Sequence, residues 1–185
     1  MIVTSMITTT KKKAGEPSAE KEIKNCPYKV GDFIVYPVHG VGEIIGIEEC
    51  TFDTITAVFL VIKIENEKLT LKIPLKNTDR LGVRHLFTKK QAEEIEDVLK
   101  RRVRMRRMMW SRRAQEYETK INSGDPLLIA EVVRELHKKN DYDQSYSERQ
   151  IYQVALSRLA KEFSIVNSMK EKEAFIYLQH ILEAA

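Results

Sequence analysis

Hydrophobic positions along the chain change their spacing once, near residue 87. Before that point, short runs rich in β-branched residues are separated by turn residues: DFIVYP (32–37), VGEIIGIEE (41–49), AVFLVIKIE (57–65) and KLTLKIPL (68–75). The last run alternates strictly, with Leu69, Leu71 and Ile73 on one side, and ENEK (65–68) before it is typical of a hairpin turn. Four or five strands in so short a stretch are too few for a sandwich. They predict a small, strongly bent β-barrel of the Tudor or SH3 type.

After residue 87 the apolar positions recur at the helical period. Thr88 followed by Gln91 matches the capping box that opens a helix. A second helix is expected from about Ser111 to Gly124, because a glycine past the last turn readily takes the left-handed conformation that closes a helix. The buried face of the first helix is expected to hold Ile95, Val98 and Leu99.

Three further helices are predicted from start signals followed by apolar stripes. The start signals are Asp125 with Pro126 at the next position, Ser147 with Gln150, and Ser168 with Glu171. The matching stripes are Leu128, Val132 and Leu136; Ile151, Ala155, Leu159 and Phe163; and Phe175, Leu178, Ile181 and Leu182. The predicted fold class is therefore α+β in two modules: a flexible polar tail over 1–25, a small Tudor/SH3-like β-barrel over 26–84, and a bundle of about five α-helices over 88–185.

Positive charge is concentrated in one segment, KRRVRMRRMMWSRR, residues 100–113. The whole chain carries 31 Lys and Arg against 27 Asp and Glu, a net charge of +4. The segment contributes eight of the positive charges and no negative one, which leaves the rest of the chain at −4. Basicity this local predicts a binding surface for nucleic acid or for an acidic protein.

The sequence lacks the residue patterns of catalysis, metal binding and membrane insertion. The four histidines are scattered without zinc-binding spacing, and the GxG in HGVGE (39–43) precedes a predicted strand instead of the helix that would hold a phosphate. No run approaches the roughly 18 to 20 apolar residues of a membrane helix. Cys26 and Cys50, without CxxC spacing, are typical of a reduced cytoplasmic protein. We expect no enzyme, cofactor or metal; a hydrolase built on His39 and a carboxylate is the weakest alternative.

Trp110, the only tryptophan, has two interpretations. It could pack into a core with neighbouring methionines, or stand as a surface ring among arginines. If one helix ran through the segment, Arg106 and Arg107 would lie one turn before Trp110 and Arg113 one turn after it, and such like charges repel unless an anion binds. DNA suits this site, because arginines neutralise phosphates while a flat ring can wedge between base steps in the minor groove. An acidic protein would satisfy the arginines equally well, so an adaptor without DNA binding stays open.

Four motifs carry a resemblance to a known family. They are YKVGDFIVYPVHGVGEIIGIE from Tyr28, LTLKIPLKNTDRLGVRHL from Leu69, WSRR from Trp110 and NSGDPLLIAEVVREL from Asn122. Together they resemble the CarD family of bacterial transcription regulators, which includes the CdnL proteins. The resemblance extends over about residues 26–185.

The resemblance implies a transcription regulator without enzymatic activity. In the CarD family the barrel binds the RNA polymerase β subunit by β-augmentation, and the helical module reaches promoter DNA at the upstream edge of the melted region. There a tryptophan wedges into the minor groove, largely independently of sequence, and stabilises the open complex. We accordingly expect a cytoplasmic monomer that reaches the nucleoid through RNA polymerase and has no membrane partner.

The resemblance also implies site residues, position by position. The DNA-binding residues are Trp110 as the wedge and Arg112 and Arg113 as the basic pair on the DNA backbone, with Arg106 and Arg107 before them. The polymerase-binding residues are Lys72, Pro74, Cys50 and Thr51. Cys50 stands where some family members carry an arginine that also faces polymerase.

Overall fold

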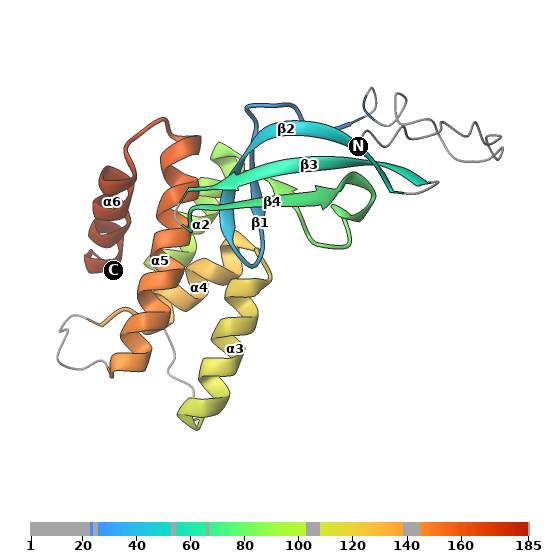
Figure 1. The fold of residues 1–185 in the computed structure, drawn as a ribbon. Helices are drawn as coiled ribbons and strands as arrows, with labels where there is room; N and C mark the ends of the chain where they lie inside the picture. The colour runs from blue at the N-terminus through green and yellow to red at the C-terminus, as the bar shows by residue number, and fades with distance from the viewer. Residues whose placement is uncertain are drawn as a thin grey trace, which may run out of the picture.

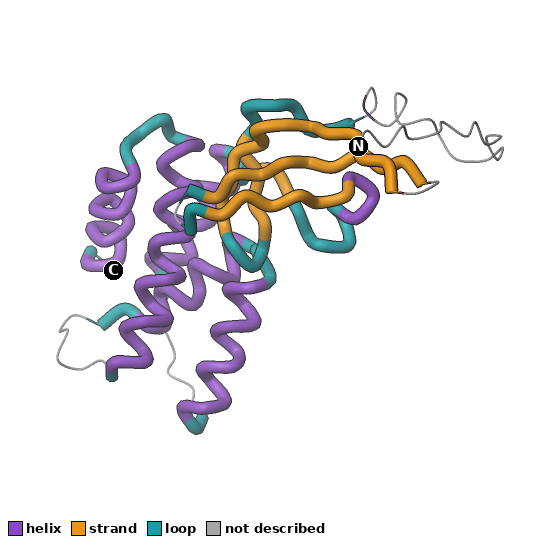
Figure 2. Tube along the Cα trace, in the orientation of Figure 1, coloured by secondary structure: helices purple, strands orange, loops and turns teal. Residues whose placement is uncertain are grey.

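The computed structural model describes residues 23, 26–52, 55–65, 67–102, 108–138 and 145–184. In these residues the strands gather in one half of the molecule and the helices in the other (Figure 1, Figure 2). The predicted α+β class, a Tudor-like β module followed by five helices, is confirmed. The tail predicted over 1–25 lies outside the described residues apart from Ile23.

One antiparallel sheet makes up the N-terminal module, in the order β4-β3-β2-β1-β5. Its strands are β1 (Phe33–Tyr36), β2 (Gly40–Phe52), β3 (Ile55–Ile64), β4 (Leu69–Pro74) and β5 (Arg84–His85), and a 3-10 helix, η1 (Leu75–Asn77), follows β4. A register shift between Ile44 and Gly46 marks a β-bulge in β2, which bends this long strand as a small barrel requires. Ile34, Leu60 and Ile62 are fully buried on the inner face.

In the C-terminal module, the described residues form five α-helices: α2 (Lys89–Lys100), α3 (Trp110–Asn122), α4 (Pro126–Leu136), α5 (Tyr146–Val166) and α6 (Glu171–Glu183). Helix α5 lies between α4 and α6 (Figure 1). Its Leu159 and Phe163 are buried in a core shared with Ile95 and Leu99 of α2 and Leu178 of α6. This core is separate from that of the barrel, so each module has its own hydrophobic interior.

The start and stop signals predicted for the first three helices are confirmed. Thr88 and Gln91 form a reciprocal capping box at the start of α2. Gly124 adopts φ +74° just past the end of α3. The Asp125 carboxylate accepts a backbone N–H of α4 at 2.9 Å, with Pro126 at the first helical position.

Most predicted stripe positions are buried: Ile95, Val98, Leu99, Val132, Leu136, Ala155, Leu159, Phe163, Leu178 and Leu182. Four others, Leu128, Ile151, Phe175 and Ile181, are only half-buried. On α4 the reason is that Ile129 and Val133 take the inward positions beside Val132 and Leu136.

The capping box predicted for α5 is wrong by two residues. The box is formed by Ser145 with Glu148, whereas Ser147 and Gln150 are exposed residues inside the helix. Both serines begin an S-x-x-E/Q pattern, so the sequence offers two alternative starts. Glu148 is also paired with Lys138, which favours the earlier one.

The capping box predicted for α6 from Ser168 and Glu171 is also wrong. Ser168 has φ +53° in the turn before the helix, whereas an N-cap residue needs an extended backbone. Glu171 is the first helical residue, and the Glu173 carboxylate accepts the Lys170 N–H at 3.2 Å. The helix therefore starts two residues later than predicted.

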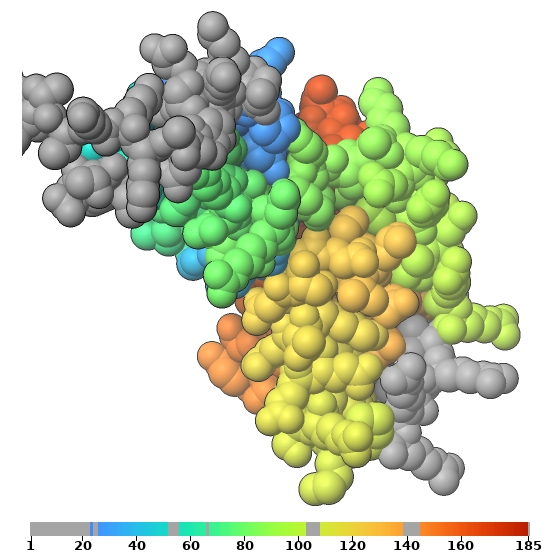
Figure 3. Space-filling view, turned by 90° about the vertical axis from the view of Figure 1, so that its right-hand side faces the viewer, coloured from blue at the N-terminus to red at the C-terminus, as the bar shows by residue number. Residues whose placement is uncertain are grey.

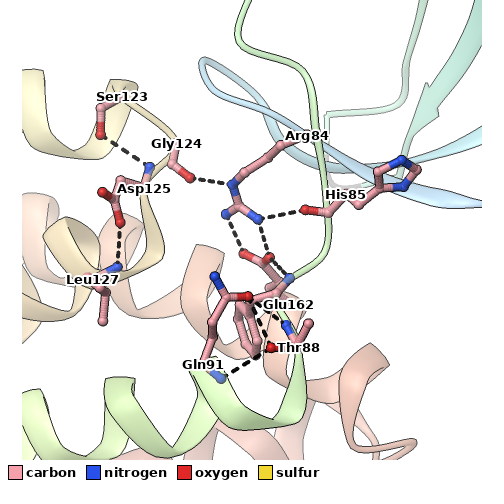
Figure 4. A network of polar contacts seen from close by, with 10 residues as sticks. Arg84, His85, Thr88, Gln91, Ser123, Gly124, Asp125, Leu127 and Glu162 are labelled. Atoms are coloured by element: carbon pink, nitrogen blue, oxygen red, sulfur yellow. Dashed lines mark hydrogen bonds and ion pairs between the residues drawn. The ribbon is translucent and has the colours of Figure 1, made fainter. Parts of the chain in front are cut away.

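A partly buried ion pair joins the barrel to the helices (Figure 4). The Arg84 guanidinium, on β5, donates to the Glu162 carboxylate of α5 at 2.6 and 2.9 Å. Its Nε donates to the Gly124 carbonyl at 2.8 Å. Glu162, only 4% exposed, also accepts the Phe87 N–H at 2.9 Å. The space-filling view shows the green barrel surface lying directly against the yellow and orange surface of α3 and α4 (Figure 3).

Arg158 of α5 makes a second joint between the modules. Its guanidinium donates to the carbonyls of Pro37, at 2.9 Å, and Val38, both in the turn between β1 and β2. It also donates to the Ile121 carbonyl at the end of α3, at 3.2 Å. Gly124 approaches Pro37 so closely that a Cβ added to it would lie 3.1 Å away. The end of α3 is thus anchored to the barrel, and the start of α3 lies away from the sheet (Figure 1).

Candidate nucleic-acid and protein interfaces

The basic segment is not one continuous helix, which corrects the arrangement expected around Trp110. Helix α2 ends at Lys100, and the residue after it is extended. Met109 is extended as well (φ −61°, ψ 140°), so α3 begins at Trp110. Repulsion among like charges at helical spacing disfavours a continuous helix here. Arg106 and Arg107, expected one helical turn before the tryptophan, lie outside the described residues.

Trp110 combines the two environments expected for it. The side chain is half-buried at the start of α3 and packs against the helical core. Its ring lies beside Tyr117, with centroids 6.5 Å apart, and the Arg113 guanidinium carbon lies 5.4 Å from the indole centroid. Burial and the nearby Glu135 raise the pKa of Tyr117 to about 12, so its hydroxyl stays protonated. The protein therefore orients the indole ring while part of it stays accessible.

Arg113 links the first turn of α3 to α5. Its guanidinium lies 3.6 Å from the Glu148 carboxylate, and the two side chains are 20% and 11% exposed. Glu148 also accepts the Lys138 ammonium at 3.3 Å and the Ser145 N–H at 3.0 Å. Burial by itself would raise the pKa of Glu148, but the hydrogen bonds from Ser145 and Lys138 outweigh burial and hold this pKa below its usual value. A charged Glu148 thus fixes Arg113 against the indole ring.

The start of α3 carries cations where a helix usually carries acids. Its first turn has no acidic residue, and Met109 makes no side-chain capping hydrogen bond. Helix α5 has Glu148 in its first turn and α6 has Glu171 and Glu173, whereas α2 and α4, like α3, have no acidic residue there. Arg112 is exposed in the first turn of α3. Because a helix N-terminus is the positive end of the dipole, arginines there are unfavourable without an anion. The arrangement favours binding of an anionic group.

The second predicted interface lies on the barrel. Strand β4 is the outermost strand of the described sheet beyond β3, so one of its edges is open to another strand. Side chains alternate along strands, so the register places Lys72 and Pro74 of β4 on the same face as Cys50 of β2. Lys72 donates to Glu48 on that face at 2.6 Å, and this hydrogen bond and charge raise the pKa of Lys72.

Thr51 lies on the opposite face of the sheet. Its hydroxyl is 3.3 Å from that of Thr56, its partner on β3. Cys50, the neighbouring position, carries a free thiol that is half-buried. The structure therefore brings three of the four predicted polymerase-binding side chains onto one face and separates Thr51 from them.

A histidine and a carboxylate do meet, although no sequence spacing indicated it. His39 Nδ1 lies 2.6 Å from a Glu67 carboxylate oxygen, and its ring stacks on Tyr36. The pair connects the turn before β2 with the turn before β4, which the pairing of β2 with β3 brings together. The His39–Glu67 pair therefore links two turns of the barrel.

Within the described ranges, no group of three or more His, Cys, Asp or Glu residues is arranged to hold a metal ion. In the same ranges, none of the helices is long and apolar enough to cross a membrane.

Comparison with known families assigns both halves of the chain. Residues 28–86 match the CarD-like/TRCF RID domain, and residues 94–179 match the CarD C-terminal domain. The chain belongs to the CarD family. The Bacillus subtilis (strain 168) protein named "Putative transcription factor YdeB" is 29% identical over 156 residues, which cover 79% of this chain and 96% of the relative. The resemblance drawn from the motifs is confirmed, and this CarD-family protein is a transcription regulator.

In this CarD-family protein, two functional neighbours of the motif residues were missed from the sequence. Glu148 holds Arg113, and Arg158 holds the end of α3, yet both come from α5. The only signal for Glu148 was its place in a capping box with Ser145. For Arg158 the sequence offered no signal, because its acceptors are backbone carbonyls.

Proposed function

We propose that this CarD-family protein bridges RNA polymerase and promoter DNA. The barrel pairs the free edge of β4 with a strand of the β subunit, and the start of α3 contacts DNA at the upstream edge of the melted region. Trp110 acts there as a wedge in the minor groove and stabilises the open complex. The observation that carries the proposal is the half-exposed Trp110 ring, set among arginines at a helix start without acids.

The arginines have distinct parts in this proposal. Arg112 is exposed in the first turn of α3 and neutralises a backbone phosphate. The Arg113 side chain is only 20% exposed and lies against Trp110 and Glu148, so its main part in the proposal is to position the indole ring. Arg106 and Arg107 add sequence-independent attraction to DNA.

Stabilisation of the open complex follows from a difference in affinity. A wedge binds an unstacked step better than a stacked one, because unstacking a base step costs a few kcal/mol that the wedge does not have to supply at the edge of a bubble. Bubble closure then requires the wedge to leave, so the open state lasts longer. The protein acts as a cytoplasmic monomer and needs no cofactor for this role.

Binding of the barrel to polymerase would use main-chain pairing at β4 and the face of the sheet that carries Lys72. β-Augmentation supplies affinity through backbone hydrogen bonds, and neighbouring side chains supply selectivity. Lys72 and Pro74 lie on the edge strand itself, and Cys50 shares their face of the sheet two strands away, on β2. The Lys72–Glu48 pair is about half exposed on both sides, so either residue can exchange its partner for one on polymerase.

Replacing Trp110 by Ala tests the wedge. We expect open-complex lifetime to fall by about tenfold, the equivalent of about 1.4 kcal/mol, while affinity for the isolated β subunit stays unchanged. The measurement is the decay of heparin-resistant complexes, with pull-down of the β subunit beside it. Equal loss of both activities, or loss of the fold, contradicts the separation of roles.

Replacing Lys72 by Glu tests the barrel side. The new carboxylate repels Glu48 and reverses the charge beside β4, so capture of the β subunit should weaken while binding to forked DNA remains. Lys172→Glu on α6 makes the same charge change on an exposed residue away from the barrel and serves as the control. Identical behaviour of the two variants argues against β4 as the docking edge.

Salt dependence separates this function from an adaptor that docks an acidic protein. The protein is titrated with a forked duplex and with the same duplex fully paired, at rising salt. A preference for the fork that persists as salt rises supports the wedge, because stacking is not screened as phosphate contacts are. Binding that ignores the fork and vanishes with salt supports the adaptor.

A further inference from the structure

Two large apolar side chains stand almost completely in solvent. Met109 is 80% exposed and Tyr146 is 76% exposed, the two highest values among the exposed large hydrophobic residues of the described chain. Both belong to helix starts: Met109 is the N-cap of α3, and Tyr146 is the first residue of α5. A partner that covered these side chains would gain the free energy of burying a methionine and an aromatic ring, which matters if the two lie in one patch.

The fold brings both side chains to one end of the helical module. The starts of α3 and α5 lie at the same end, remote from the sheet (Figure 1). One turn into these helices, Arg113 and Glu148 are 3.6 Å apart, which fixes the two starts beside each other. Trp110 directly follows Met109, and its ring lies against the same Arg113. We call Met109, Trp110 and Tyr146 the apolar tip.

The rim of the apolar tip is cationic. Arg112 and Arg149 are exposed in the first turns of α3 and α5. Both helices point the positive ends of their dipoles at the tip. A carboxylate at this end, Glu148, is 11% exposed and already paired with Arg113 and Lys138. Apolar groups inside a cationic rim fit a partner that carries both phosphates and accessible ring faces, which is nucleic acid with an unstacked base.

We propose that the apolar tip binds an unpaired base at the edge of melted DNA, with Tyr146 stacking on the base and Met109 packing against the adjoining step. The proposal deepens the function given above and rests on it. Every base offers a π-face, so stacking on Tyr146 is tolerant of sequence. Methionine is among the apolar side chains that enter base steps. In an intact duplex the base faces are hidden by stacking, so this contact forms only where strands have separated.

The test uses the full chain and two DNA probes: a forked duplex with 2-aminopurine as its first unpaired base, and the same duplex fully paired. Tyr146→Ala should weaken fork binding by about tenfold, within the range for loss of one base–aromatic stack. Affinity for the paired duplex should change by less than about twofold, because the phosphate contacts remain. Wild-type protein should quench 2-aminopurine fluorescence, and Tyr146→Ala should not.

Tyr146→Phe keeps the ring and should behave as wild type, which excludes a role of the hydroxyl alone. Met109→Ala should lower the fork preference in the same direction, by about threefold. The matched control is Tyr177→Ala, which removes a tyrosine from α6 that is 41% exposed and bonded to Glu96. Because Met109 and Tyr146 are exposed, thermal unfolding of both variants should match that of the wild type.

Two outcomes overturn the inference. Unchanged fork preference and quenching in Tyr146→Ala shows that the base does not meet this ring, and equal weakening on fork and duplex shows an electrostatic effect instead of stacking. Failure of the proposed function is distinguishable from either. If wild type shows no fork preference, the proposed function fails; if Trp110→Ala loses the preference and Tyr146→Ala keeps it, only the inference fails.

Discussion

At the residue scale, Arg112 and Arg113 are neighbours in sequence with different surroundings. Arg112 is exposed, whereas Arg113 packs on Trp110 and pairs with the largely buried Glu148. Arg112→Ala should reduce the salt slope of DNA binding by about one and leave stability unchanged. Arg113→Ala should lower the free energy of unfolding by about 1–3 kcal/mol, because Glu148 loses a partner. Salt titrations and urea unfolding measure the two effects; equal profiles for both variants contradict this division.

Glu148 also gives the protein a pH dependence with a definite sign. Its pKa in the folded state is below its usual value, so its contribution to stability is fully present above the pKa of the unfolded chain, about 4.3. That contribution is lost as pH falls through the lower pKa of the folded state. Glu148→Gln lacks this contribution. The difference in free energy of unfolding between wild type and variant should therefore be large at pH 7 and small near pH 3. Urea unfolding at both pH values is the measurement, and a gap independent of pH contradicts the assignment.

At the element scale, the end of α3 depends on a glycine in two ways. Gly124 has φ +74°, and an added Cβ would meet Pro37 at 3.1 Å. Gly31 has φ +92° with nothing within 4 Å, so Gly31→Ala measures backbone strain alone, about 1 kcal/mol. Gly124→Ala should cost about 1–2 kcal/mol more, because it also forces the helix end away from the barrel. Denaturant midpoints compare the two; similar costs mean that the helix end can shift freely.

Helix and strand elements were predictable because their signals are local. The period change near residue 87, the Thr88 capping box and the Gly124 stop each depend on residues within one or two turns. The start of α5 was misplaced because Ser145 and Ser147 offer equivalent local patterns. Lys138, two residues past the end of α4, pairs with Glu148 and favours the earlier start. The local sequence pattern therefore does not predict which serine begins the helix.

The residues of the candidate site also divide into those with a local sequence signal and those placed by tertiary contacts. Trp110 and Arg112 were predicted because WSRR is a contiguous motif. Tyr146 was not predicted, because it lies on another helix, α5. The contact that brings the start of α5 to the start of α3 is the ion pair between Arg113 and Glu148. Proximity of this kind comes from tertiary packing, so the motif predicts the proposed wedge residue and only the structure shows its neighbours.

At the scale of the whole molecule, α3 is a spacer between the two proposed interfaces. It has 13 residues, about 20 Å at 1.5 Å per residue. Its end is anchored to the barrel through Gly124 and Arg158, and its start carries Trp110. If the barrel is docked on polymerase, the wedge is held at a fixed position relative to the enzyme. Such preorganisation saves the entropy of ordering two flexibly linked modules.

Arg158→Met should uncouple the two interfaces. The variant removes the hydrogen bonds to the Pro37 and Ile121 carbonyls while filling similar space. Affinities for the isolated β subunit and for forked DNA should each change by less than about twofold, but affinity for polymerase already bound to that DNA should fall by about tenfold, since effective concentration depends on fixed geometry. Lys161→Met is the control, because Lys161 also reaches the barrel, at Glu65, but through an exposed ion pair of little energy. Unchanged affinity for the polymerase–DNA complex, with only stability reduced, would show that the joint supports the fold and does not set the position of the wedge.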